Sequence, residues 1–177
     1  LAGLEAGATA LETAIKEKGY AFHRVVIPPQ QLKGGKVVLK VVAFKVGAVT
    51  VEGNQRFSEE NIRRSLASIK SGRTLNTKEI ARMLQVANEH PARKTAVFLR
   101  QGEIPETIDA RVKVNESRPY QVFSTFTNTG DAETGRSRLS VGAQHNNLFQ
   151  HDHAATLSFT TSPEFVSDVV QLGFHYQ

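Results

Sequence analysis

The stretch VEGNQRFSEENI, residues 51–62, joins the end of a predicted strand to the start of a predicted helix. Its Gly-Asn pair tolerates a positive φ, which lets the chain turn where the strand ends. The Ser58 hydroxyl is suited to accept a free amide of the first helical turn, and Phe57 with Ile62 has the spacing of a hydrophobic staple. We therefore expect a structural turn and cap, not a ligand loop, from the following residues: Gly53, Asn54, Phe57, Ser58 and Ile62.

A second helix start follows in residues 75–90, where Asn76 and Glu79 have the spacing of a capping box. Two strand-like segments come next, 94–100 and 107–115, and the second alternates between apolar and polar residues. Together with the strand that precedes the Gly-Asn pair, the order is β-α-α-β-β. Burying the apolar stripes of these elements against one another predicts a three-stranded sheet with two helices on one face.

The segment before this unit has the last three elements of the same order, a helix followed by two strands. Residues 9–18 have helical spacing of apolar positions, residues 20–27 and 36–44 are strand-like, and Gly34-Gly35 is suited to the turn between them. The pattern indicates an internal repeat whose first copy has lost its opening strand and helix.

After Pro119 the pattern changes to four strand-like segments of about ten residues with no helix between them. Apolar side chains alternate with small and polar ones, as in transmembrane β-barrel strands that face lipid on one side and a wet lumen on the other. A soluble antiparallel sheet would produce the same alternation. Four strands cannot close a barrel, so we expect this piece to continue into further strands or to lie on a partner.

Composition excludes few classes of function. The net charge of +5 permits an acidic partner, but Lys and Arg are spread along the chain, so nucleic acid is not indicated. Because the chain has no cysteine, neither disulfides nor thiolate metal sites hold the fold. Residues 1–22 lack the basic start and continuous apolar region of an intact signal peptide.

No catalytic residue, metal site or cofactor is predicted. The His-Asp-His run at residues 151–153 resembles a ligand cluster, but neighbouring side chains on a strand point to opposite faces. Ser58, His90 and Asp109 form a triad in name only, since Ser58 is explained by capping and His90 by the end of a helix before proline. Neither GxxxxGK[ST] nor GxGxxG occurs.

Most of the chain resembles a known family. Residues 46–66, 71–91 and 97–120 resemble the second POTRA domain of two-partner secretion transporters of the haemolysin-activator and filamentous-haemagglutinin type. Residues 18–42 resemble the second half of their first POTRA domain, and residues 124–153 the start of their barrel. The resemblance implies an α+β chain with three parts: the C-terminal part of the first POTRA domain (1–43), the second POTRA domain (44–117) and the first strands of a truncated transmembrane β-barrel (118–177).

The resemblance also implies a function. Such proteins sit in the Gram-negative outer membrane with their POTRA domains in the periplasm, where these capture the secretion signal of one large exoprotein. We expect capture by β-augmentation, in which a client strand pairs with a sheet edge, and we expect residues 94–100 to be that edge. The predicted client-binding residues are Lys94, Val97, Leu99, Arg100, Arg82 and Gln85. The expected partners are the exoprotein and, for residues 118–177, a lipid bilayer, with no nucleic acid.

Two other functions stay open at this point. A barrel-assembly factor of the outer membrane also has POTRA domains, although it carries more of them. A basic soluble α/β domain that binds nucleic acid would need exposed aromatic residues among Arg and Lys on its sheet. The chain lacks the plug helix, half of the first POTRA domain and most of the barrel of the family, so we expect a fragment that does not transport by itself.

Overall fold

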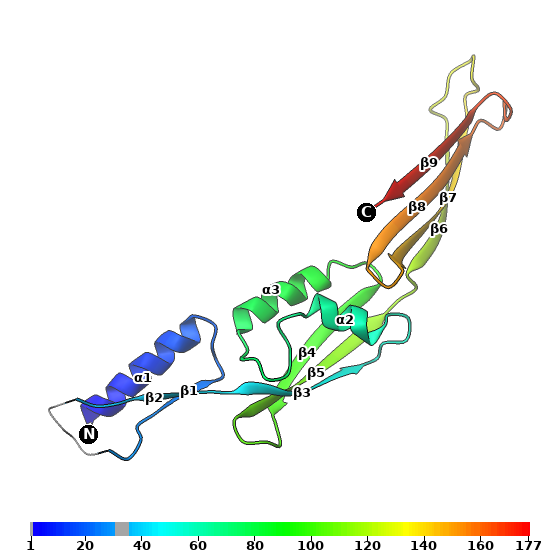
Figure 1. Cartoon of the computed structure of the whole chain (residues 1–177). Helices are drawn as coiled ribbons and strands as arrows, with labels where there is room; N and C mark the ends of the chain where they lie inside the picture. Colours follow the sequence, from blue (N-terminus) through cyan, green and yellow to red (C-terminus); the bar gives the residue numbers. More distant parts are fainter. Residues whose placement is uncertain (1, 31–35) are drawn as a thin grey trace. The chain divides into compact units, whose positions relative to one another are not determined.

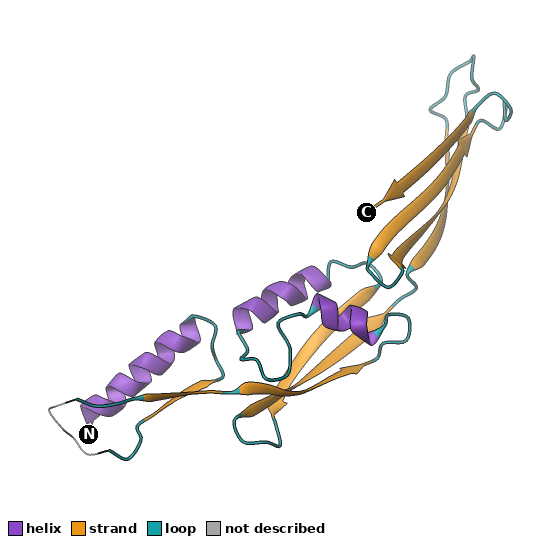
Figure 2. Ribbon diagram, viewed as in Figure 1, coloured by secondary structure: helices purple, strands orange, loops and turns teal. Residues whose placement is uncertain are grey.

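The computed structural model describes residues 2–30 and 36–177 (Figure 1). These residues form two compact units. The first unit contains the residues up to 53 together with 62–89 and 95–115, and the second contains 54–61, 90–94 and 116–177. The predicted Gly34-Gly35 turn lies outside the described residues. Helices and sheets are both present (Figure 2), so the α+β fold class is confirmed.

The N-terminal segment consists of helix α1 (Ala2–Glu17) and the antiparallel strands β1 (His23–Val26) and β2 (Lys40–Ala43). The helix is longer than the predicted 9–18, since it begins at Ala2. The strands are shorter than predicted. Gly19, with a φ of 96°, ends the helix, and a turn occupies the next residues before β1 can begin.

The next sheet contains three strands in the order β3-β5-β4, with β5 in the middle and β3 parallel to it. Its elements are β3 (Lys45–Glu52), α2 (Glu59–Ser65), α3 (Thr77–Ala87), β4 (Arg93–Gln101) and β5 (Thr107–Glu116). Figure 2 shows both helices on the same side of this sheet. Alternate residues of β5 are buried there, namely Ile108, Ala110, Val112 and Val114. The predicted β-α-α-β-β unit is therefore confirmed.

Side chains cap the N-termini of both α2 and α3. The Ser58 hydroxyl accepts the Asn61 N–H at 3.2 Å, and Asn76 accepts the amides of Lys78 and Glu79 at 3.0 and 3.3 Å. The Glu79 carboxylate accepts the Ser68 hydroxyl. Of the Gly-Asn pair, Gly53 has a positive φ of 87°, whereas Asn54 donates its side-chain amide to the Phe57 carbonyl at 3.2 Å.

Replacing Ser58 by alanine is expected to lower the free energy of unfolding by about 1 kcal/mol, because the amide of Asn61 loses its acceptor. Urea unfolding followed by far-UV circular dichroism measures this loss. Ser65→Ala is the matched control in the same helix. The Ser65 hydroxyl bonds back to the Ile62 carbonyl, an interaction that stabilises a helix little. Equal losses in the two variants would contradict the cap.

The C-terminal part is a four-stranded antiparallel sheet in the order β6-β7-β8-β9. Its strands are β6 (Tyr120–Thr127), β7 (Arg138–Leu148), β8 (His153–Thr161) and β9 (Val170–Tyr176). The register aligns Val122, Ala143, Leu157 and Phe174 across one face. Every strand therefore contributes apolar side chains to this face, as predicted. The opposite face carries mainly polar side chains, such as Gln121, Gln144, Thr156 and His175.

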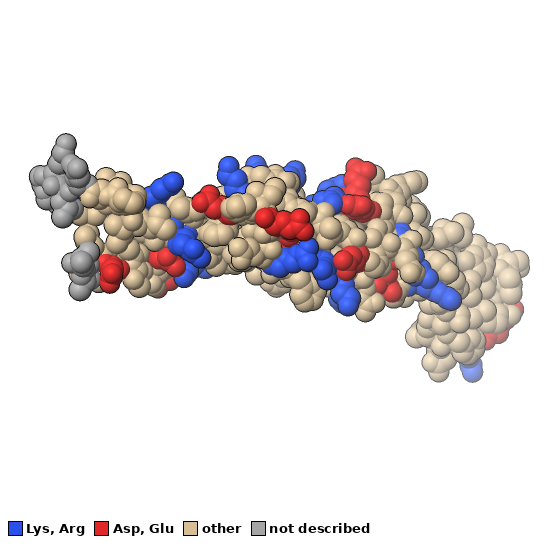
Figure 3. Space-filling model, turned by 90° about the horizontal axis from the view of Figure 1, so that it is seen from below, with Lys and Arg blue, Asp and Glu red and all other residues tan. Residues whose placement is uncertain are grey.

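Charged side chains are distributed unevenly over the surface. Figure 3 shows Lys and Arg interspersed with Asp and Glu on the visible surface of the first unit, whereas the visible surface of β6–β9 carries few charges. Within the described residues, no helix has the length and apolar character needed to cross a membrane.

Candidate interaction surface

Strand β4 forms one end of the three-stranded sheet, so half of its backbone groups face an open edge. Gly102 N–H bonds the Thr107 carbonyl and Ser117 N–H bonds the Ala92 carbonyl, both at 2.9 Å. These bonds at opposite ends show that β4 and β5 are antiparallel and keep one register between them. The N–H and C=O groups of every second residue from Ala92 to Gly102 thus bond to β5. The N–H and C=O groups of the residues in between point to the open edge.

One of these outward residues, Thr95, already has a partner. The Asn88 side chain accepts the Thr95 N–H at 2.6 Å and donates to the Thr95 carbonyl at 2.9 Å. A side-chain amide that bonds both groups of one residue replaces the backbone of a neighbouring strand. Asn88 is the C-cap of α3, which places its side chain beside β4. The open edge therefore begins at Val97 and continues through Leu99.

The structure places the predicted client-binding residues on two sides of this edge. Val97 and Leu99 are half-buried on the side of the sheet that carries the helices, opposite Val112 and Ala110 of β5. Lys94 and Arg100 are exposed on the other side. Arg82 and Gln85 are exposed on α3. The six residues thus border one edge but do not form a single cluster.

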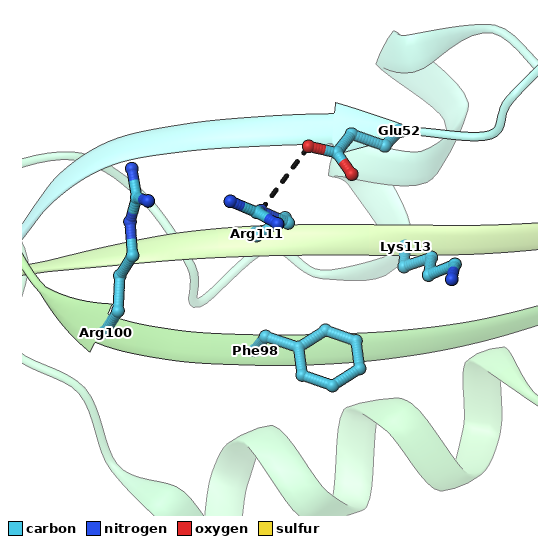
Figure 4. A pocket seen from close by; sticks show the side chains of 5 residues that line it. All are labelled: Glu52, Phe98, Arg100, Arg111 and Lys113. Atoms are coloured by element: carbon cyan, nitrogen blue, oxygen red, sulfur yellow. Dashed lines mark ion pairs between the residues drawn. The ribbon is translucent and has the colours of Figure 1, made fainter.

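Figure 4 shows a hollow on the outward face of the sheet, with a volume of about 340 Å³. Its lining residues are Glu52, Phe98, Arg100, Arg111 and Lys113. The Phe98 side chain is 56% exposed and was not among the predicted residues. Strand alternation could have identified it, because Phe98 has the same parity as Lys94 and Arg100.

Ion pairs occupy part of this face. The Arg111 Nε lies 3.4 Å from the Glu52 carboxylate, and an Arg100 Nη lies 3.9 Å from Asp109. The other Asp109 oxygen accepts the Ala48 N–H at 2.9 Å. No ion pair involving Lys113 is present among the described residues. The face therefore offers an apolar ring surrounded by cationic groups.

A second polar cluster lies in the other unit, around Arg93. The Arg93 side chain is 1% exposed, and its guanidinium donates to Asp152 at 2.9 Å and to Asn61. The guanidinium also lies 5.1 Å from the centroid of the Phe57 ring. The sequence did not indicate this cluster, because Arg93 and Asp152 are far apart in the chain.

The residues considered for catalysis have structural roles. Asp152 of the His-Asp-His run binds Arg93, and the described residues contain no group of three His, Cys, Asp or Glu that could hold a metal ion. His90 was explained above by the end of a helix, but α3 already ends at Ala87. Its Nε2 lies 2.6 Å from the Asn146 carbonyl, and its ring packs edge-on against Phe57.

Comparison with known proteins identifies the relationship. The family described as "POTRA domain, ShlB-type" matches residues 1–43, and the POTRA family described as "Surface antigen variable number repeat" matches residues 44–98. Heme/hemopexin transporter protein HuxB of Haemophilus influenzae (strain 86-028NP) is 22% identical over 134 residues, covering 75% of this chain and 24% of HuxB. The chain contains POTRA sequence in residues 1–98 and is homologous to HuxB.

Two further similarities extend this relationship. Outer membrane transporter CdiB of Dickeya dadantii (strain 3937) is 24% identical over 133 residues, covering 75% of the POTRA chain and 23% of CdiB. The solved structure of CdiB from Escherichia coli superposes with a TM-score of 0.73 at 19% identity, covering 98% of the POTRA chain and 32% of CdiB. The POTRA chain thus has the fold of CdiB and spans about a quarter of the length of these curated relatives.

Proposed function

We propose that the β4 edge captures an extended segment of an exported polypeptide by β-augmentation. The observation that carries this proposal is the open run of backbone groups at Val97 and Leu99, next to the position where Asn88 already pairs with Thr95. An added strand would gain main-chain hydrogen bonds along this edge whatever its side chains are. Asn88 limits the strand at one end, so the captured segment is short.

In the proposed setting, the client is a secreted exoprotein that presents its secretion domain to the POTRA part in the periplasm. The parts of the chain are those expected above: residues 1–43 and 44–117 for the POTRA domains and 118–177 for the barrel. The apolar face of β6–β9 would contact the lipid of the outer membrane. The name of the Dickeya relative, an outer membrane transporter, supports this location. No catalytic step is proposed.

Hydrogen exchange measured by NMR tests the capture edge. The probe is a capped seven-residue peptide of alternating Thr and Val, which favours extended conformations. Binding is expected to slow exchange of the Val97 and Leu99 amides, which face the open edge. Exchange of the Ala96 and Phe98 amides is expected to change little, because these amides already bond to β5. Peptide binding that leaves Val97 and Leu99 unprotected would rule out capture at this edge.

Leu99→Pro provides an independent test, because it removes one edge-facing N–H without removing a bond to β5. Proline is tolerated in edge strands at such positions. We expect peptide affinity to fall about tenfold, as lost main-chain bonds to the peptide leave its groups unpaired. Leu99→Ala is the matched control, since it shortens the side chain but keeps the N–H. Circular dichroism establishes that both variants are folded.

A further inference from the structure

We infer that the segment bound at β4 is selected by its outward side chains, with an apolar residue opposite Phe98 and a carboxylate two positions away, opposite Arg100. This inference rests on the proposed function, since it requires a strand at the β4 edge. It names the chemistry of the client, which the backbone pairing alone leaves unspecified.

The geometry follows from the pleat of the sheet. Alternate side chains of a strand point to the same face, and directly opposite side chains of neighbouring strands lie about 5 Å apart at Cβ. Phe98 and Arg100 both point outward from β4, toward the face shown in Figure 4. An added strand would therefore place one side chain beside Phe98 and another, two residues along, beside Arg100. The residue between them would point to the helix side.

The apolar preference comes from Phe98. Its ring is more than half exposed on the outer strand of the sheet. On its other flank it lies opposite Arg111, which is paired with Glu52. An aliphatic or aromatic side chain on an added strand would cover the free side of the ring, and such cross-strand pairs are stabilising. A charged side chain at this position would lose hydration without gaining a partner.

The acidic preference comes from the balance of charge on this face. Three of the five residues that line the hollow are cationic, namely Arg100, Arg111 and Lys113, and Glu52 is the acidic one. The Arg100 side chain is 65% exposed, and its contact with Asp109 is long at 3.9 Å. Its guanidinium has five N–H donors, enough for Asp109 on one side and a client carboxylate on the other. A lysine on the client would instead lie directly beside the like charge of the Arg100 guanidinium.

Charge-swap binding experiments test this pattern with the full chain. The probes are capped, fluorescently labelled peptides of threonine with a central Val-Thr-Asp, a central Asp-Thr-Val, and the same two with Lys in place of Asp. Both orders are needed, because one fits a parallel and the other an antiparallel added strand. By fluorescence anisotropy, the better Asp peptide is expected to bind about fivefold more tightly than its Lys counterpart.

Arg100→Glu is expected to reverse this preference, so that the Lys peptide binds more tightly than the Asp peptide. Lys70→Glu is the matched control, an equal change of charge at an exposed residue of the same unit outside β4, and it is expected to leave the preference for Asp in place. Phe98→Ala is expected to weaken binding of the better Asp peptide about threefold. An otherwise identical peptide with Thr in place of Val is expected to bind Phe98→Ala as tightly as the Val peptide does.

The outcomes separate the two proposals. If Val97 and Leu99 become protected but affinity is indifferent to the charge of the peptide and to Arg100→Glu, the side-chain inference is wrong while edge capture stands. If no peptide protects these amides, the proposed function itself fails. If Lys70→Glu reverses the preference as fully as Arg100→Glu does, general electrostatic attraction replaces the specific pairing opposite Arg100.

Discussion

Asp152→Ala is expected to destabilise the second unit by about 3 kcal/mol, because it leaves the buried Arg93 guanidinium without its carboxylate. The remaining partner of the guanidinium, the Asn61 side-chain oxygen, is uncharged. An unpaired buried charge lowers the free energy of unfolding by far more than an exposed ion pair raises it, so this single change has a large effect. Hydrogen exchange measured by mass spectrometry should show faster exchange in residues 54–61 and 147–153.

The effect should concentrate in the turn between β7 and β8, which depends on these contacts. Phe149, Gln150 and Asp152 all have φ near 60°, a left-handed conformation that is costly for residues with a side chain. The turn is held by bonds to the 54–61 segment. Asn61 donates to the Gln150 carbonyl at 2.8 Å, and the Gln150 side chain accepts the Ser58 N–H at 3.0 Å. Loss of Asp152 removes the charged member of this set.

Two variants control for this result. Asp168→Ala removes an exposed carboxylate from the same unit and should leave exchange in the β7–β8 turn unchanged. Adding Arg93→Met to Asp152→Ala removes the uncompensated charge and should restore part of the lost protection. The single variant Arg93→Met completes the comparison. If the loss of stability in the double variant equals the sum of the losses in the two single variants, Arg93 and Asp152 are not energetically coupled.

The fold was predictable where its determinants are local. The sequence shows which side of each element is buried, through the alternation in residues 107–115 and the apolar stripes of the two helices. Burying these sides against one another requires a sheet with both helices on one face. The length of α1 was underestimated, because residues 2–8 contain a single large apolar side chain and two glycines, and so give little periodic signal. The strand-only character after Pro119 was also a local signal.

The candidate surface was less predictable, because it depends on pairing between strands. The backbone direction of Val97 and Leu99 follows from the register of β4 against β5, which is set by bonds at Gly102 and Ala92. The role of Asn88 requires knowing that the end of α3 lies beside Thr95. Likewise, no sequence signal pairs Asp152 with Arg93, because only the fold brings these two residues together.

Gly53→Ala is expected to lower the free energy of unfolding by about 3 kcal/mol, combining backbone strain with a steric clash. Gly53 has a φ of 87°, which L side chains rarely adopt. A Cβ at this position would lie 2.2 Å from the carbonyl oxygen of Val114. Because that atom belongs to the backbone of the central strand β5, it cannot move aside as a flexible side chain can. Urea unfolding followed by circular dichroism measures the loss.

Gly72→Ala separates the two contributions. Gly72 has a similar φ of 80°, but a Cβ there would meet no atom within 4 Å. This variant should therefore lose only the cost of the left-handed backbone, about 1 kcal/mol. The difference between the two variants isolates the clash with β5. If both lose the same amount, the glycine that follows β3 is required only for its backbone conformation, and its close approach to Val114 contributes nothing.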